Sequence, residues 1–148
     1  MKIDYHNLYT HLILITKNRN PCITELNRDR IEKYITGIAA NHRSKLYSIF
    51  ANPEHVHMLI SRSPRISETE LATRIADSSS IFINQNKLSQ RIFEWQDSAS
   101  AFSVSKKDVD QVCKYILNQE EHHRKISFAE EYDALIKYHQ QTLKFGLR

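Results

Sequence analysis

The sequence predicts an α/β fold of the α+β kind: an antiparallel sheet with helices packed mainly on one face, in a single domain of residues 1–148. Two observations support this prediction. Short β-branched and leucine-rich segments alternate with longer segments whose apolar residues recur at helical spacing. Two successive strand-like segments are joined by a turn at Asn52-Pro53, which is typical of an antiparallel hairpin.

The composition fits one globular domain and excludes several classes of protein. Hydrophobic residues make up 41% and charged residues 26% of the chain, which are ordinary values for a folded protein. Cys22 and Cys113 show no sign of pairing, so we expect a reducing, cytoplasmic location. No apolar run approaches the ~20 residues of a membrane span, and two glycines are too few for a P-loop. The net charge of +4 is compatible with a nucleic-acid partner but does not demonstrate one.

The first half of the chain reads as strand, helix, strand and strand. Ile31, Ile35 and Ile38 form the apolar stripe of the helix. His11, inside the first strand, is expected to be a core or sheet-face histidine and not a ligand. The predicted elements are a strand at Leu8–Thr16, a helix from Thr24 or Asn27 to about His42, a strand at Lys45–Ala51 and a strand ending at Ile60.

The second half adds helix, strand, helix and a final helix. Ser67 and Glu70 fit the capping-box pattern, as do Ser127 and Glu130. The resulting order is strand–helix–strand–strand–helix–strand–helix followed by the final helix, and its first six elements are those of a ferredoxin-like fold. The predicted elements are a helix from Ser67 to about Lys87 carrying Leu71, Ile75 and Ile81 or Phe82, a strand at Ala99–Val104, a helix from Lys106 to His123 capped by Ser105, and a helix from Ser127 to about Gln141.

Two histidines stand out on the strand that follows the Asn52-Pro53 turn. Since side chains alternate along a strand, His55 and His57 project from the same face, about 7 Å apart along it. Two neutral imidazoles at this spacing can bind one metal ion. Glu54 is expected to point to the opposite face. A pair of half-buried histidines satisfied by the backbone is the alternative, and it is the commoner role of an isolated His-X-His.

The helix predicted for Lys106–His123 has a polar side as well as an apolar one. Tyr115 lies roughly 120° from the centre of the apolar stripe. Gln119 is four residues further on, so a continuous helix would place it directly above Tyr115. A purely structural role for this tyrosine is equally compatible with the pattern. Trp95 could stack on a nucleic-acid base, but a lone tryptophan at the entry to a strand more often belongs to the core.

These motifs together resemble a known family. His55-Val56-His57 followed by a helical YILNQ segment resembles the HUH motif and single catalytic tyrosine of small insertion-sequence transposases that act on single-stranded DNA, among them the REP-associated tyrosine transposases. The resemblance covers nearly the whole chain, because HLILITKNRNP, NPEHVHMLI, WQDSASAFSVS and YILNQEEHHRK occur in the family's order. Ser100 stands where members often have glycine, which puts only local backbone detail in question.

The resemblance implies a nucleophilic phosphoryl transfer on single-stranded DNA with hairpin ends. Tyr115 would attack a phosphodiester to give a 5′-phosphotyrosine, and His55, His57 and Gln119 would hold a divalent metal, Mg²⁺ or Mn²⁺. It also implies a homodimer in which the tyrosine helix of one subunit completes the site of the other. Basic side chains would contact phosphates, although each can equally be ordinary surface charge; the candidates are Lys17, Arg19, Arg28, Arg30, Arg43 and Lys45.

Two other functions remain open from the sequence. One is a non-catalytic nucleic-acid-binding module on the same scaffold. RNA binders of this kind display paired aromatics on adjacent strands, and the sequence shows no clear pair. The other is a metal-dependent phosphodiesterase with water as its nucleophile, which would release product without forming a protein adduct.

Overall fold

The computed structural model describes residues 1–146 and divides into two compact units, Met1–Leu117 and the segment that begins at Asn118, each of which is described by itself. The first unit has the predicted strand–helix–strand–strand–helix–strand order. The elements are β1 (Tyr9–Ile15), a 3₁₀ turn (Lys17–Arg19), α1 (Glu25–Asn41), β2 (Lys45–Ala51), β3 (His55–Ser61), α2 (Glu68–Gln85), β4 (Ser100–Val104), a 3₁₀ turn (Lys106–Asp108) and α3 (Val109–Leu117) in the first unit, and α4 (Gln119–His123) and α5 (Phe128–Gly146) in the second.

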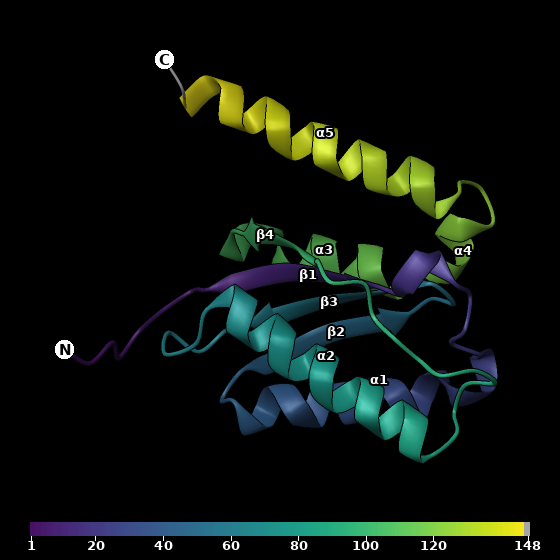
Figure 1. The fold of residues 1–148 in the computed structure, drawn as a ribbon. Coiled ribbons are helices and arrows are strands. Elements are labelled where there is room, and N and C mark those ends of the chain that lie inside the picture. The colour runs from purple at the N-terminus through teal and green to yellow at the C-terminus, as the bar shows by residue number, and fades with distance from the viewer. Residues whose placement is uncertain (147–148) are drawn as a thin grey trace. The chain divides into compact units, whose positions relative to one another are not determined.

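The four strands form one antiparallel sheet in the order β2-β3-β1-β4. β1 and β3 occupy its centre, and β2 and β4 its edges (Figure 1). This order is the one expected when two strand–helix–strand halves interleave, and it confirms the predicted ferredoxin-like α+β fold.

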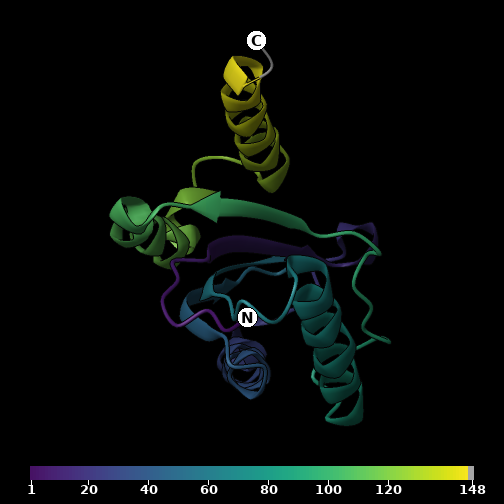
Figure 2. The ribbon, with the colours of Figure 1, turned by 90° about the vertical axis from the view of Figure 1, so that its left-hand side faces the viewer.

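One face of the sheet carries the main core. Alternate residues of the central strands, among them Leu12, Leu14 and Met58, are at most 3% exposed and pack with apolar side chains of α1 and α2. α1 and α2 therefore both lie on this face, as Figures 1 and 2 show. Ile35 of α1 and Ile75 of α2 are fully buried there, as the helical spacing of the sequence predicts.

The other face of the sheet carries the histidines. Side chains alternate along each strand, so residues next to the core residues in sequence, such as His11 on β1 and His57 on β3, point to this side. The short helix α3 packs here against β2 and β3. We call this side of the sheet the histidine face.

Local signals set several element ends as predicted. The Ser67 hydroxyl accepts a hydrogen bond from the Glu70 amide (3.0 Å), which caps α2. The Ser127 hydroxyl likewise accepts from the Glu130 amide (3.2 Å) before α5. Trp95 packs against the core next to Phe93, with ring centroids 4.8 Å apart, so its role in the fold is structural.

The sequence predicts Ile81 or Phe82 as the last core residue of α2. Phe82 is partly buried and packs against the core, whereas Ile81 is 56% exposed, and Ile83 is fully buried. One other helix prediction is wrong. The helix predicted for Lys106–His123 is not continuous, because the backbone leaves the helical region at Asn118 (φ −96°, ψ 17°). The helix that was predicted to carry both Tyr115 and Gln119 is therefore interrupted between them.

No helix within the described residues is both long enough and apolar enough to cross a membrane.

Candidate active site

The histidine pair lies at the start of β3, in the middle of the sheet. His55 and His57 are both fully buried, and their ring centroids are 4.9 Å apart. The turn before them is fixed to the end of β1, because the Thr16 amide donates to the Glu54 carbonyl (2.9 Å) and the Thr16 hydroxyl lies between the Glu54 carbonyl (3.1 Å) and the Asn20 carbonyl (2.7 Å). The two rings are thus held by a turn and strand that are anchored on each side.

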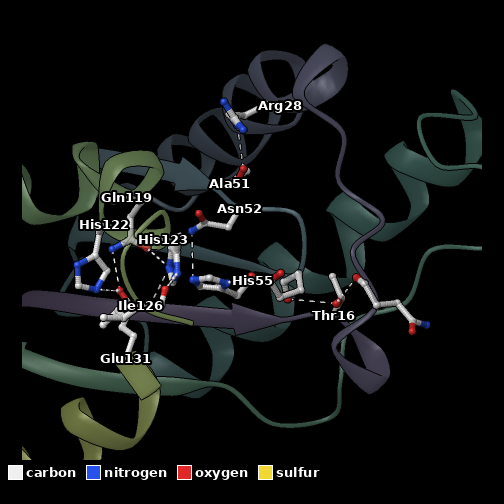
Figure 3. Close-up of polar contacts among 12 residues, drawn as sticks. Thr16, Arg28, Ala51, Asn52, His55, Gln119, His122, His123, Ile126 and Glu131 are labelled. Atoms are coloured by element: carbon white, nitrogen blue, oxygen red, sulfur yellow. Dashed lines mark hydrogen bonds and ion pairs between the residues drawn. The ribbon is translucent and has the colours of Figure 1, made fainter. Parts of the chain in front are cut away.

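Glu54 orients the first histidine. A Glu54 carboxylate oxygen lies 2.6 Å from His55 Nδ1. On the other side of the ring the Asn52 amide nitrogen lies 3.1 Å from His55 Nε2 (Figure 3). Since a carboxylate accepts and an NH₂ group donates, His55 carries its proton on Nδ1 and a lone pair on Nε2. A carboxylate behind a histidine is the usual support of a metal-binding imidazole. The expectation that Glu54 points away is wrong, because Glu54 precedes the strand and strand alternation does not apply to it.

His11 supports the second histidine. Its Nε2 lies 2.9 Å from Nδ1 of His57, so one of these nitrogens donates and the other accepts. If His57 donates from Nδ1, its Nε2 lone pair is directed away from His11. His11 is a buried sheet-face residue, as expected from the sequence, but it also contacts the candidate site.

Tyr115 lies over these histidines within the same unit. Its ring is 5.7 Å from that of His57 and 6.2 Å from that of His11, in edge-on orientations. The packing of α3 against β2 and β3 sets the position of Tyr115, and the neighbouring Ile116 is completely buried. The sequence-predicted nucleophile and histidine pair are therefore brought together in one chain.

The second unit holds a network of its own around Glu131. The Gln119 amide nitrogen donates to Glu131 (2.9 Å), and His122 Nε2 and His123 Nε2 lie 3.2 and 3.3 Å from its carboxylate oxygens (Figure 3). Gln119 is among the ligands expected from the sequence, whereas Glu131 and His123 are not. The repeated acidic and histidine residues after YILNQ are the signal that could have indicated them.

Three acceptor atoms of this network converge. His123 Nδ1 lies 3.1 Å from the Ile126 carbonyl, which can only accept, so Nδ1 carries a proton. His123 Nε2 then faces the Gln119 carbonyl oxygen at 2.9 Å and a Glu131 oxygen at 3.3 Å. A nitrogen between two oxygen acceptors requires either a second proton or a metal cation, and Glu131 supplies the negative charge that suits both.

The predicted DNA-contacting residues are dispersed over the first unit, and several have structural partners. Arg28 donates to the Ala51 carbonyl (3.0 Å) and lies over the Phe50 ring, and Lys17 pairs with Glu94 (3.2 Å). Lys45 lies over the Tyr47 ring. Arg30 lies within 3.4 Å of the Asn86 side chain, and Arg19 and Arg43 occupy loop positions with φ of 53° and 54°.

Arg28 acts with Glu32 to hold the end of β2. The Ala51 amide donates to Glu32 (2.9 Å), and the Ala51 carbonyl accepts from Arg28. Burial raises the pKa of the Glu32 carboxyl, and the Ala51 amide and Arg28 oppose that shift. The side chains of Arg28 and Glu32 on α1 therefore hold the backbone of Ala51, the residue that leads into the Asn52-Pro53 turn.

Comparison with known proteins adds a family to this geometry. The model of the family described as "Transposase IS200 like" matches residues 4–119. The chain belongs to the IS200-like transposase family. Membership makes it a transposase-type, DNA-processing protein, and it confirms the family expected from the HVH and YILNQ motifs.

One curated relative and two solved structures are similar to this chain. The ISDra2 transposase TnpA of Deinococcus radiodurans is 26% identical over 119 residues, which span 77% of this chain and 85% of the relative. A crystal structure of a candidate transposase from D. radiodurans superposes with a TM-score of 0.64 at 22% identity, covering 80% of this chain and 96% of that one. A REP-associated tyrosine transposase bound to a REP hairpin superposes with a TM-score of 0.58 at 14% identity, covering 83% and 72%. The two structures share the fold of this IS200-like transposase.

Proposed function

We propose that this protein cleaves and rejoins single-stranded DNA at hairpin-marked element ends through a covalent tyrosine intermediate. The observation that carries the proposal is the position of Tyr115, whose ring lies 5.7 Å from that of His57 in a site supported by Glu54 and His11. Family membership supports a transposase, and the hairpin-bound structural neighbour supports hairpin DNA as the substrate.

In the proposed reaction Tyr115 forms a bond to phosphorus while the bond from phosphorus to the 3′ oxygen breaks. The products are a 5′-phosphotyrosine and a 3′-hydroxyl, and the tyrosine proton is transferred overall to the departing 3′ oxygen. The reverse reaction by another 3′-hydroxyl rejoins a strand, because the phosphodiester energy is kept in the protein–DNA bond. An unperturbed tyrosine has a pKa of about 10 and is mostly protonated at neutral pH, so the site must favour its ionisation.

We propose that His55, His57 and Gln119 hold one divalent metal ion, Mg²⁺ or Mn²⁺. The residues of each unit suit this role. Glu54 makes Nε2 the acceptor atom of His55, where the Asn52 amide now donates, and the Gln119 carbonyl belongs to a group of converging acceptors that needs a second proton or a metal cation. His123 and Glu131 are of metal-ligating type as well. When bound, the ion would polarise the scissile phosphate. Imidazole and amide ligands favour manganese over magnesium, which prefers oxygen atoms and retains its waters.

We propose that Lys17, Arg19, Arg28, Arg30, Arg43 and Lys45 contribute phosphate contacts, with Arg28 as the weakest candidate because its guanidinium donates to the Ala51 carbonyl and lies over the Phe50 ring. A homodimer with shared sites stays a prediction from the resemblance. Within one chain Tyr115 already contacts the ring of its own His57, so shared sites require α3 to exchange between subunits.

The decisive experiment incubates the protein with single-stranded hairpin DNA and Mn²⁺, followed by a denaturing gel. A band of protein covalently joined to the 5′ end of the cleaved strand is expected. Cleaved DNA without an adduct would indicate a water-dependent phosphodiesterase, and binding without cleavage would indicate a non-catalytic binding module. Either result would overturn the proposed function.

Gln119→Ala should weaken Mn²⁺ binding and reduce adduct formation without unfolding the protein. Alanine is the best helix former, so α4 is retained while the amide oxygen is lost. The matched control is Gln111→Ala, because Gln111 is an exposed glutamine of α3. Mn²⁺ affinity measured by EPR without DNA separates metal binding from chemistry. Equal affinity in the Gln119→Ala and Gln111→Ala variants would assign the third ligand to another side chain.

Glu54→Gln should lower Mn²⁺ affinity by about 10- to 100-fold, the usual cost of losing the partner of a metal-binding histidine. The amide can turn its NH₂ toward His55 Nδ1, which moves the histidine proton to Nε2 and removes the lone pair there. Nitrogen-15 NMR of the histidines reports this change of tautomer directly. The control is Glu25→Gln, at the exposed start of α1. An unchanged tautomer together with unchanged affinity would show that Glu54 has no part in orienting His55.

A further inference from the structure

Two tyrosines from strands that are not neighbours meet on the histidine face. The ring centroids of Tyr9 on β1 and Tyr47 on β2 are 5.7 Å apart, with the planes at 69°. β3 runs between these strands (Figure 1). The β3 residue paired with Tyr9 is Ser61, whose small side chain leaves space for the two rings to meet above it.

A β-bulge brings Tyr47 to this position. The register between β2 and β3 shifts between Leu46 and Ser48, so Tyr47 is the extra residue and has no partner in the β3 ladder. Bulges are frequent on edge strands next to functional sites, where they redirect a side chain. Lys45 is paired with Ser61 and therefore shares the row of Tyr9.

The tyrosine pair is accessible and carries a cation. Tyr47 is 43% exposed, and Nζ of Lys45 lies 5.0 Å from the centre of its ring. The pair is also close to the candidate active site, since Tyr9 precedes His11 by two residues on the same strand face, or about 7 Å. His11 in turn contacts the rings of His57 and Tyr115. We call Tyr9, Tyr47 and Lys45 the aromatic platform.

We propose that the aromatic platform binds unpaired bases of the DNA strand next to the scissile phosphate. This inference rests on the proposed function and adds the part of the substrate that is recognised beside the site. Aromatic rings bind unpaired bases of any sequence by stacking, and a lysine next to them can contact the intervening phosphate. Duplex DNA buries the faces of its bases, so the occupant is a single strand.

The test measures binding of a fluorescently labelled single-stranded oligonucleotide by anisotropy, with all variants in a Tyr115→Phe background so that cleavage does not interfere. Tyr47→Leu and Tyr9→Leu should each weaken binding by about 5- to 100-fold, because leucine keeps the bulk but lacks the flat ring. Tyr47→Phe should bind like the parent. Lys45→Gln should reduce the slope of log affinity against log salt concentration by about 0.7.

Tyr34→Leu provides the control, because Tyr34 is a partly exposed tyrosine of α1 that stacks on Phe82 and α1 covers the opposite face. Tyr47→Leu and its parent should bind a blunt duplex of the same length with equal affinity. Equal affinity of Tyr47→Leu and Tyr34→Leu for the single strand, or no binding by the parent, would contradict the proposed role of the aromatic platform. The adduct gel tests the proposed function separately: binding that depends on Tyr47 without an adduct would leave the platform standing and overturn the chemistry.

Discussion

The Tyr115→Phe variant should bind single-stranded DNA as tightly as the wild-type protein and form no covalent adduct. Only the hydroxyl oxygen is removed, so the edge-on contacts of the ring with His57 and His11 are kept and the fold is unaffected. Since the tyrosine oxygen is the atom that would bond to phosphorus, the loss of adduct should be complete. Anisotropy gives the affinity, and a denaturing gel with 3′-labelled substrate gives the adduct, because the fragment that stays joined to the tyrosine carries that label.

Tyr138→Phe is the matched control, because Tyr138 is an exposed tyrosine of α5. It should form adduct at the wild-type rate. An adduct that persists in Tyr115→Phe would remove Tyr115 from the mechanism, and peptide mapping would then locate the true nucleophile. Loss of DNA binding along with the adduct would instead indicate that the hydroxyl binds substrate.

Mixing two inactive variants should fail to restore activity if each site is built within one chain. His57→Ala lacks part of the proposed metal site and Tyr115→Phe lacks the nucleophile. Because Tyr115 lies beside His57 of its own chain, no site in a heterodimer of the two would then be complete. Sites built within one chain would therefore give no adduct from heterodimers purified through two different tags.

Exchange of α3 between subunits gives the opposite result. One site would then combine the histidines of the Tyr115→Phe chain with the tyrosine of the His57→Ala chain, and labelled DNA would appear only on the His57→Ala subunit. That outcome would establish the shared site implied by the resemblance. Failure to recover any heterodimer would contradict the predicted homodimer itself. His55→Ala in place of His57→Ala gives an independent pair, in case one substitution disturbs the buried cluster.

The sequence predicts most of the fold because the relevant signals are local. The helical spacing of isoleucine and leucine predicts the helices that bury Ile35 and Ile75. The spacing of serine and glutamate predicts the helix caps at Ser67 and Ser127. His55 and His57 share a face for the same reason, since alternation depends only on the backbone of one strand.

The rest of the site depends on contacts that local pattern does not contain. The link from His11 to His57 joins two strands, and the position of Glu54 depends on a turn held by Thr16. The break at Asn118 interrupts a sequence with good helical spacing, so periodicity alone overestimates the helix. The contact of Tyr9 with Tyr47 requires a bulge and a small residue between two strands.

The bulge in β2 has a consequence for how this protein family can change over time. On either side of Tyr47 the strand alternates normally, with Leu46, Ile49 and Ala51 toward the core. Loss of a single codon at Tyr47 would therefore leave a regular strand with the same residues in the core. A three-nucleotide deletion at this codon would therefore remove the proposed DNA contact of Tyr47 while the core residues of β2 keep their places.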